Sequence, residues 1–341
     1  MTPLPPLPIV DGVLRIDNSA MSNILRCPRY GWNSFVLKRV PARESDDLIF
    51  GKAIHAAQEW RYKTCGSREM TSEEKAAQEQ VLEKAFEGIE IDETNWQNLG
   101  RAKESIAYWN EHFKSEPFDV LETERPVERH LGAITALKWC NSCKRILRSW
   151  EVIGEEEERK YCAESAQQIL VDFQGRLDAI VRYERKPLVH DYKKMKWKDD
   201  ERDAVRWQSS PQFRAYCWLA SSLGYGEVRD YWIDSIVARK PLSRETKNSL
   251  PRNEFSREQY SITDSDIEEW KRDTLKHIET FLRYCADAPP PMNLNACSWP
   301  TKCAYWDCCS LKTEEQRSAW LNSGAYRDNL WSPMKKDETP S

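Results

Sequence analysis

The stretch Gly175–Lys196, GRLDAIVRYERKPLVHDYKKMK, contains two runs rich in β-branched residues on either side of a short polar segment at Arg185–Pro187. We expect these runs to form neighbouring strands joined by a turn. Asp178 then lies on the first strand, and Asp191 and Lys193 lie on the second. Because side chains alternate along a strand, Asp191 and Lys193 share one face, and pairing of the strands places Asp178 over the same site.

These three side chains together predict a centre that hydrolyses phosphodiester bonds. Two carboxylates on one face repel each other unless a cation lies between them, and Mg²⁺ or Mn²⁺ takes carboxylate oxygens as ligands. A lysine beside such a metal can orient a water or stabilise the negative charge that builds on a phosphate under attack. A D-x-K triplet alone is common on solvated strands. The upstream G-x-x-D on a neighbouring strand is what makes the combination informative.

The composition predicts a globular protein. The chain has 341 residues, of which 40% are hydrophobic, and it contains 15 tryptophans, so a disordered or fibrous protein is excluded. No run approaches the length of apolar sequence that spans a membrane, and the start MTPLPPLPIV lacks the features of a signal peptide. We therefore expect an intracellular, cytoplasmic location without a membrane partner.

The charge of the chain limits how it can contact nucleic acid. The formal net charge is -4, so a generally basic surface is excluded and any contact with DNA must use a local basic patch. Lys194, Lys196 and Lys198 form such a cluster after the second strand, and we expect them to follow a phosphate backbone. Trp197 and Trp207 are candidates for stacking on bases, although most tryptophans pack in cores.

The periodicity of the chain predicts a largely helical first half and a mixed α/β second half. After a proline-rich arm, we expect helices over Ser22–Phe35, Phe50–Tyr62 and within residues 67–115. From Val120 the pattern alternates as in strands, and the short run SWEVI is also β-like. A helix over residues 208–224, a strand over Glu227–Arg239 and a last helix over Asp264–Ala288 complete the expected elements.

In four separate places the sequence resembles the RecB-like branch of the PD-(D/E)XK nucleases. GKAIHAAQEW is similar to the G-x-x-x-H helix of that family, whose histidine, here His55, helps to ligate the metal. GRLD and DYK are similar to its acidic motifs, and QFRAY to the Q-x-x-x-Y helix that follows the active-site strands. The resemblance implies His55, Asp178 and Asp191 as metal ligands, Lys193 as the assisting lysine, and Gln212 and Tyr216 as residues that line the site.

The resemblance also implies the architecture. We expect one nuclease domain over residues 1–341, with a restriction-endonuclease-like mixed central sheet flanked by helices. Within it, residues 67–115 would form a helical insertion, residues 132–166 a cysteine-containing insertion, and residues 289–312 the region of an iron–sulfur cluster. His190 precedes Asp191 and should point to the opposite face of its strand, so it is not a site residue.

Eleven cysteines in an intracellular chain point to metal ligation rather than to disulfides. A subgroup of RecB-like nucleases holds an iron–sulfur cluster with one cysteine before the nuclease motifs and three after them. This chain resembles that subgroup, which implies a [4Fe–4S] cluster on Cys27, Cys297, Cys303 and Cys309 that joins the N-terminal and C-terminal regions as a clasp. Cys308 is the spare thiol, and zinc is the alternative metal.

A second group of cysteines is incomplete. Cys140-x2-Cys143 is followed by Cys162, and Ser165 stands where a fourth cysteine would complete a zinc ribbon. His130 could supply the missing ligand, and a hairpin with free thiols is the alternative. The three remaining cysteines that we assign read as buried small hydrophobes: Cys65, Cys217 and Cys285.

The sequence therefore predicts a Mg²⁺- or Mn²⁺-dependent deoxyribonuclease. The resemblance favours an exonuclease that acts on DNA ends, often single-stranded, in bacterial or phage recombination, repair or DNA metabolism. No G-x-x-x-x-G-K-[ST] motif is present, so unwinding would need a helicase or another recombination protein as a partner. The alternative is a subunit that uses the same fold and cluster to bind DNA or a partner without cleaving it.

Overall fold

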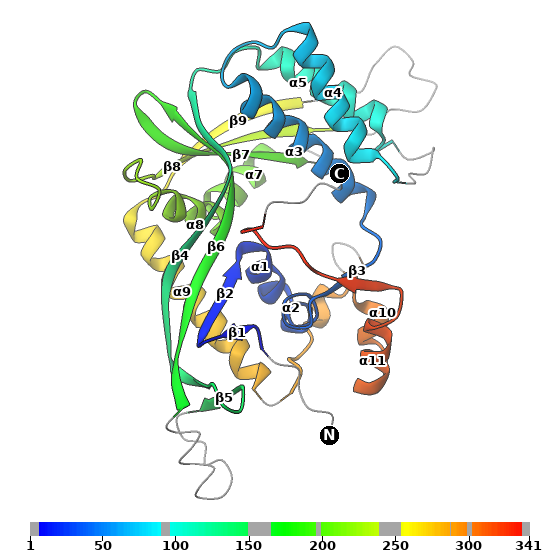
Figure 1. Cartoon of the computed structure of the whole chain (residues 1–341), viewed down its shortest axis with the longest axis vertical. Coiled ribbons are helices and arrows are strands. Elements are labelled where there is room, and N and C mark those ends of the chain that lie inside the picture. Colours follow the sequence, from blue (N-terminus) through cyan, green and yellow to red (C-terminus); the bar gives the residue numbers. More distant parts are fainter. Residues whose placement is uncertain are drawn as a thin grey trace, which may run out of the picture. The chain divides into compact units, whose positions relative to one another are not determined.

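The computed structural model describes residues 7–89, 96–148, 165–195, 199–238, 254–286, 288–298 and 302–335 (Figure 1). The chain divides into two compact units, neither of which is continuous in sequence. The first comprises Met1–Arg43, Glu128–Gly175 and Ile267–Ser341, and the second comprises Glu44–Val127 and Arg176–Asp266. Two long strands, β4 (Asp119–Cys140) and β6 (Ala166–Tyr183), contribute residues to both units.

The second unit is built on a mixed sheet. Its strands are the second half of β6, then β7 (Lys186–Met195), β8 (Asp230–Val237) and β9 (Glu254–Ser261). β6 and β7 are antiparallel, β7 and β8 are parallel, and β8 and β9 are antiparallel. A sheet with both kinds of pairing and helices on its faces confirms the predicted α/β fold with a mixed central sheet.

Helices cover both faces of this sheet (Figure 1). α3 (Asp46–Cys65) packs against the sheet face that carries Tyr192 and Trp232, and α4 (Ser72–Phe86) and α5 (Leu99–His112) pack on α3 in the same buried cluster. α8 (Pro211–Ala220) packs against the opposite face, where the ring of Phe213 stacks on that of Tyr231 with centroids 4.5 Å apart. α7 (Asp200–Gln208) precedes α8 in the chain.

The β6–β7 hairpin is where the sequence predicted it, with a small difference at the turn. Glu184 and Arg185 both have positive φ values, 47° and 68°, which is the backbone of a two-residue type I′ turn. Pro187 already belongs to β7 and pairs with Arg182. The turn therefore consists of Glu184–Arg185 rather than Arg185–Pro187, because these strands need the tighter turn that matches their twist.

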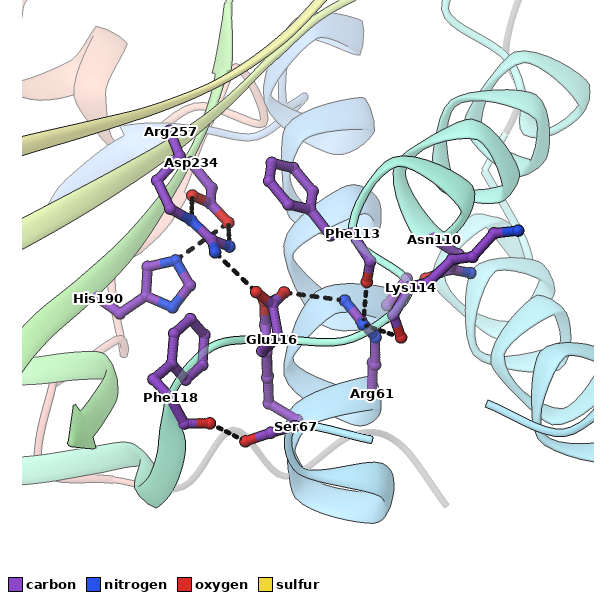
Figure 2. Close-up of polar contacts among 12 residues, drawn as sticks. Arg61, Ser67, Asn110, Phe113, Lys114, Glu116, Phe118, His190, Asp234 and Arg257 are labelled. Atoms are coloured by element: carbon purple, nitrogen blue, oxygen red, sulfur yellow. Dashed lines mark hydrogen bonds and ion pairs between the residues drawn. The ribbon is translucent and has the colours of Figure 1, made fainter. Parts of the chain in front are cut away.

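A buried polar network connects the sheet of the second unit to α3 (Figure 2). The guanidinium of Arg257 donates to both carboxylate oxygens of Asp234, at 2.7 and 2.6 Å, and to Glu116 at 2.7 Å. Arg61, on α3, lies 3.3 Å from the other oxygen of Glu116. The side chains of Glu116 and Asp234 are fully buried, so the two arginines supply the charge that makes this burial tolerable.

The first unit contains both terminal regions of the described chain. β1 (Ile9–Val10) and β2 (Val13–Asp17) form a hairpin, and β2 pairs in parallel with the first half of β6. The other elements are β5 (Arg145–Arg148), α9 (Asp264–Cys285, which begins in the second unit), a 3₁₀ turn (Leu294–Ala296), α10 (Trp306–Cys309) and α11 (Glu314–Leu321). β3 (Arg39–Pro41) pairs antiparallel with β10 (Tyr326–Asp328).

The first predicted helix is wrong in its extent. Instead of one helix over Ser22–Phe35, the chain forms α1 (Asn18–Arg26), a short α2 (Pro28–Gly31) and a π-helical turn (Trp32–Val36). Cys27 is extended, with φ −163° and ψ 118°. Proline lacks a backbone N–H and disfavours the helical conformation in the residue before it, so Pro28 ends α1 at this point.

Other predicted boundaries differ by smaller amounts. α3 begins at Asp46 rather than Phe50, because Ser45 accepts a hydrogen bond from the Leu48 N–H and caps the helix. The helix predicted over residues 208–224 corresponds to α8, which is shorter and spans Pro211–Ala220. The sequence analysis did not identify β1, β2, α7 or β9, and the predicted strand SWEVI lies outside the described residues.

Candidate metal centre

Asp178 and Asp191 lie at the open end of the β6–β7 hairpin. The hairpin pairs Ala179 with His190, so the next positions along the two strands are Asp178 and Asp191. The side chain of Asp178 is 13% exposed and that of Asp191 is fully buried. The turn chemistry and the strand register thus bring together two carboxylates that are separated in sequence by the whole hairpin.

His55, on α3, lies against one of these carboxylates. Its Nε2 is 2.9 Å from Asp178 Oδ2. The same oxygen accepts a hydrogen bond from the backbone N–H of Tyr192 at 3.1 Å. The Tyr192 ring meets the His55 ring edge to face, with centroids 5.7 Å apart. α3 therefore presents its histidine to the sheet at the position of the first acidic residue.

The sequence analysis missed a third acidic residue, Glu124 on β4. Glu124 Oε1 is 3.7 Å from His55 Nε2, and the ligand atoms of His55, Glu124 and Asp178 all lie within 4.8 Å of one another. Glu124 has a φ of 49°, in the left-handed region that residues other than glycine rarely adopt. Such backbone strain costs about 1–3 kcal/mol and clusters at functional sites. Here it occurs at the residue whose carboxylate faces His55.

Lys193 pairs with Asp191 on the same strand face. Lys193 Nζ is 2.5 Å from Asp191 Oδ2, and the lysine side chain remains 25% exposed. Neither oxygen of Asp191 accepts a well-aligned hydrogen bond from the described residues, and the same holds for Glu124 Oε1. Buried carboxylate oxygens without donors are costly unless a cation satisfies them. The ion pair with Lys193 is thus the main compensation for the buried charge of Asp191.

The two aspartates of the centre have pKa values that are shifted in opposite directions. Burial and the neighbouring charge of Asp178 together raise the pKa of Asp191 to about 7, although Lys193 lowers it. Burial also raises the pKa of Asp178, but His55, Lys193 and the Tyr192 N–H together outweigh burial and hold this pKa well below its usual range. Burial raises the pKa of Glu124 to about 7. The two groups with raised pKa values are the ones that a cation would stabilise most.

The pKa values of His55 and Lys193 are both raised by the neighbouring carboxylates. Burial lowers the pKa of His55, but the charge of Asp178 and its hydrogen bond outweigh this effect and raise the pKa to about 9. Burial likewise lowers the pKa of Lys193, and the charges of Asp191 and Asp178 raise it above its ordinary value. Both cationic side chains therefore compensate carboxylates, which is the electrostatic role that a bound divalent cation would share.

The two residues predicted on α8 lie on a helix that packs on the strand of Lys193. Gln212 and Tyr216 are both half-buried. Between them in sequence, Phe213 lies under the ammonium of Lys193, with Nζ 5.9 Å from the ring centroid. α8 therefore contacts the lysine through Phe213, a residue that the sequence analysis did not single out. The roles of Gln212 and Tyr216 stay predictions.

The basic cluster is only partly described. Lys194 is nearly buried, with 6% of its side chain exposed; it forms an ion pair with Asp47 and lies over the ring of Phe50, 5.5 Å from the centroid. Lys196, Lys198 and Trp197 lie outside the described residues. Trp207 is 3% exposed, so the expectation of an exposed stacking residue is wrong at that position, where the ring packs near Phe213.

The four cysteines predicted to hold a cluster all belong to the first unit. Asn293 donates its backbone N–H to Cys27 Sγ at 3.2 Å, and the Cys303 N–H donates to the Cys297 carbonyl at 2.8 Å. Burial raises the pKa of Cys297, and the charges of Cys303, Cys27 and Cys309 raise it further, so the four thiols are electrostatic neighbours. No three cysteine sulfurs of the described chain lie within 4.8 Å of one another.

The second cysteine group does not form the predicted site with His130. Cys140 ends β4, and its sulfur accepts a long hydrogen bond from the Cys143 N–H at 3.5 Å. His130 lies on the same strand, where ten residues of extended chain separate it from Cys140 by about 33 Å at the usual rise per residue. His130 Nδ1 is instead 3.0 Å from Asp172, so it is not a ligand with Cys140. Cys162 lies outside the described residues.

A family profile described as the PD-(D/E)XK nuclease superfamily matches residues 18–310. The chain belongs to this superfamily. Its members are metal-dependent nucleases, and in this chain the predicted acidic motifs and the histidine helix meet at a candidate acidic metal site. No curated protein sequence matches the chain.

Two solved structures are similar to the chain at low identity. One is a protein from Eubacterium rectale provisionally described as an exonuclease, which has 14% sequence identity and a TM-score of 0.46 over 88% of this chain and 90% of its own. The other is SSO0001, with 14% identity and a TM-score of 0.23 over 69% of this chain and 77% of its own.

The residues present fit the metal that the superfamily uses. One imidazole and carboxylate oxygens form a donor set that divalent cations such as Mn²⁺ and Mg²⁺ accept. Glu124 Oε1 and the oxygens of Asp191 accept no well-aligned hydrogen bond from the described residues, so a cation at these positions would lower the cost of their burial. No helix of the described residues has the length and apolar character needed to cross a lipid bilayer.

Proposed function

We propose that the chain is a Mg²⁺- or Mn²⁺-dependent deoxyribonuclease of the RecB-like branch that acts as an exonuclease at DNA ends. The observation that carries the proposal is the convergence of His55, Glu124 and Asp178 next to the Asp191–Lys193 pair. His55, Asp178 and Asp191 would hold the metal, with Glu124 as a further carboxylate. When bound, the metal supplies Lewis-acid activation of the phosphate and of a water.

The residues of the chain then have separate tasks. Lys193 is positioned by its contact with Asp191 and by the Phe213 ring, and its exposed ammonium can orient the attacking water or stabilise charge on the phosphate. The Tyr192 N–H holds the Asp178 carboxylate in place. This division matches the order of burial, since the aspartates are enclosed while Lys193 and His55 remain partly accessible to a substrate.

We also propose that Cys27, Cys297, Cys303 and Cys309 hold a [4Fe–4S] cluster. The support is that the four thiols influence one another electrostatically and that Asn293 ties the C-terminal region to the segment of Cys27. Cys308 is 1% exposed and packs with Tyr305, Leu321 and Tyr326, so it has a core position of its own. Four thiolates shared by four irons stand further apart than the ligands of one zinc ion do.

The nuclease proposal is tested with end-labelled single-stranded and double-stranded DNA in Mg²⁺ or Mn²⁺. We expect the wild type to shorten DNA from its ends and Lys193→Ala to lose activity by a factor of about 10² or more. Lys186→Ala is the matched control, because Lys186 is an exposed residue on the same strand. Wild-type protein that binds DNA without cleaving it would support the alternative of a binding subunit.

The cluster proposal has its own measurement. Anaerobically purified wild type should contain iron and sulfide in a ratio of about four each per chain, with broad visible absorbance. Cys309→Ser should lose the iron, while Cys308→Ser should retain it. Colourless wild type that contains zinc would contradict the assignment.

A further inference from the structure

Arg206, in the last turn of α7, is an exposed arginine whose side chain makes no ion pair or hydrogen bond with the described residues. Its own helix offers it no carboxylate. Asp203, one turn earlier, is 4% exposed and accepts the backbone N–H of Asp199 at 2.9 Å, and Arg202, four residues earlier, has the same charge as Arg206. The described residues therefore leave the charge of this guanidinium without a compensating anion.

The guanidinium of Arg206 is held in place by an aromatic ring. Its Cζ lies 4.4 Å from the centroid of the Trp207 ring, a distance at which a cation and an aromatic face attract each other. Trp207 is itself well anchored: it is 3% exposed, and its carbonyl accepts a hydrogen bond from the hydroxyl of Tyr231 on β8 at 2.9 Å. The exposed cation of Arg206 therefore rests on a buried part of the fold.

Arg206 and Lys193 lie on two rings that contact each other. The rings of Trp207 and Phe213 meet edge to face with centroids 6.1 Å apart, and Lys193 Nζ is 5.9 Å from the centroid of Phe213. Burial lowers the pKa of Lys193, the charges of the two aspartates raise it, and the charge of Arg206 lowers it. The two cations are thus electrostatic neighbours as well as neighbours in the packing of α7 and α8.

The two cations differ in how they are compensated. Lys193 has the carboxylate of Asp191, whereas Arg206 has no anion among the described residues. Neighbouring cations repel each other, and an anion that contacts both removes the repulsion. A guanidinium presents several N–H donors in a fixed plane, so it can contact two oxygens of one phosphate at once. An uncompensated guanidinium beside the assisting lysine therefore suits the phosphate on which that lysine acts.

We propose that Arg206 is a further catalytic residue, whose guanidinium donates to the non-bridging oxygens of the scissile phosphate next to Lys193. This inference rests on the proposed nuclease function. In the hydrolysis, a water oxygen bonds to phosphorus and the bond to the leaving oxygen breaks; the water loses a proton and the leaving oxygen gains one. Negative charge builds on the non-bridging oxygens in the transition state, so the guanidinium stabilises that state more than the bound substrate.

The test measures cleavage of end-labelled DNA in Mn²⁺ over a range of DNA concentrations. Arg206→Ala should lower kcat by a factor of about 10², with KM changed by less than about threefold. Arg206→Lys keeps the charge but loses the planar set of donors, so it should lose about tenfold in kcat. Guanidinium ions added at low millimolar concentration should raise the activity of Arg206→Ala about fivefold and should not raise that of the wild type.

Arg182→Ala is the matched control. Arg182 is an exposed arginine opposite Pro187, and six residues of β7, roughly 20 Å at the usual rise, separate Pro187 from Lys193. This variant should cleave like the wild type, and thermal unfolding checks that all variants are folded. The role of Arg206 is overturned, and the nuclease function stands, if Arg206→Ala behaves like the control, if its loss is confined to KM, or if guanidinium ions restore nothing. If the wild type cleaves no DNA, both proposals fail.

Discussion

Two fully buried carboxylates on adjacent strands of the second unit have opposite environments. Asp234 on β8 accepts two hydrogen bonds from Arg257 and lies 3.0 Å from His190 Nε2, so its negative charge is matched inside the protein (Figure 2). Asp191 on β7 has one ion pair, with Lys193, and no well-aligned hydrogen bond from the described residues. Their pKa values differ accordingly: Asp234 falls to about 2, and Asp191 rises to about 7.

This difference distinguishes a structural carboxylate from one reserved for a ligand. Burial raises the pKa of both residues, and only the partners differ. At Asp234 the partners belong to the fold and tie β8 to β9 through Arg257. At Asp191 the fold supplies only the ammonium of Lys193, so a further cation would stabilise the buried carboxylate. Burial by itself therefore does not distinguish the two acids; the number of their partners does.

The largest effect that separates the two residues is on catalysis. Asp191→Asn should reduce nuclease activity about 10³-fold or more, because it removes a metal ligand and the partner of Lys193. Its stability should equal or exceed that of the wild type in the absence of metal, since a neutral amide replaces a poorly paired buried charge. Activity on labelled DNA and urea unfolding in EDTA measure the two quantities. Retained activity would remove Asp191 from the site.

The second effect is on stability. A substitution at Asp234 should destabilise the fold, whereas Asp191→Asn should not. Asp234→Ala should lower the free energy of unfolding by about 3–5 kcal/mol, because Arg257 then keeps a buried charge without its main partner. Asp230→Asn, at the start of the same strand, is the control and should change stability little. Urea unfolding measures both variants. If Asp234→Ala unfolds like the control, the network in Figure 2 does not stabilise the fold as we infer.

The low pKa of Asp234 predicts how acid affects the stability of the protein. The pKa of Asp234 is about 2 in the folded chain, below the ordinary aspartate value of 3.8, so its contribution to stability is present above about pH 4 and is lost as the pH falls toward 2. The magnitude is on the order of 2 kcal/mol. Asp234→Asn should remove this part of the acid transition. Acid titrations followed by circular dichroism compare the two proteins, and equal steepness between pH 4 and 2 would contradict the assignment.

Most of the candidate site could be predicted because its residues lie in short motifs. Asp178, Asp191 and Lys193 are brought together by one hairpin, so local strand and turn patterns suffice to place them. His55 needed the resemblance to a family, because a histidine on a helix carries no local signal of ligation. Glu124 was missed since Glu122 and Glu128 lie on the same strand and look equivalent in sequence. Only the folded chain shows that Glu124 faces His55.

Some of the helices and strands that the sequence analysis missed have a local signal in the sequence, and others depend on residues that are distant in the chain. The Asp11–Gly12 pair, with φ values of 52° and 77°, is a local hairpin signal that predicts β1 and β2 and could have been used. The break at Pro28 was also readable from the sequence. β9 was not, because EFSREQYS is polar and its place in the sheet depends on pairing with β8. Propensity is a weak guide where tertiary pairing decides the structure.

The smallest effect concerns Glu124, whose environment resembles that of Asp191. Burial raises its pKa from 4.5 to about 7, so the folded metal-free protein is favoured below about pH 4.5 and loses this advantage as the pH rises through 7. Glu124→Gln should therefore be more stable than the wild type at pH 8 in EDTA, on the order of 1 kcal/mol, and the difference should vanish below about pH 4. Mn²⁺ should reverse the order, because it stabilises the wild type more than a variant that has lost a ligand. Thermal unfolding at both pH values, with and without Mn²⁺, measures this reversal. Equal stabilisation of both proteins by Mn²⁺ would mean that Glu124 faces the centre without binding the metal.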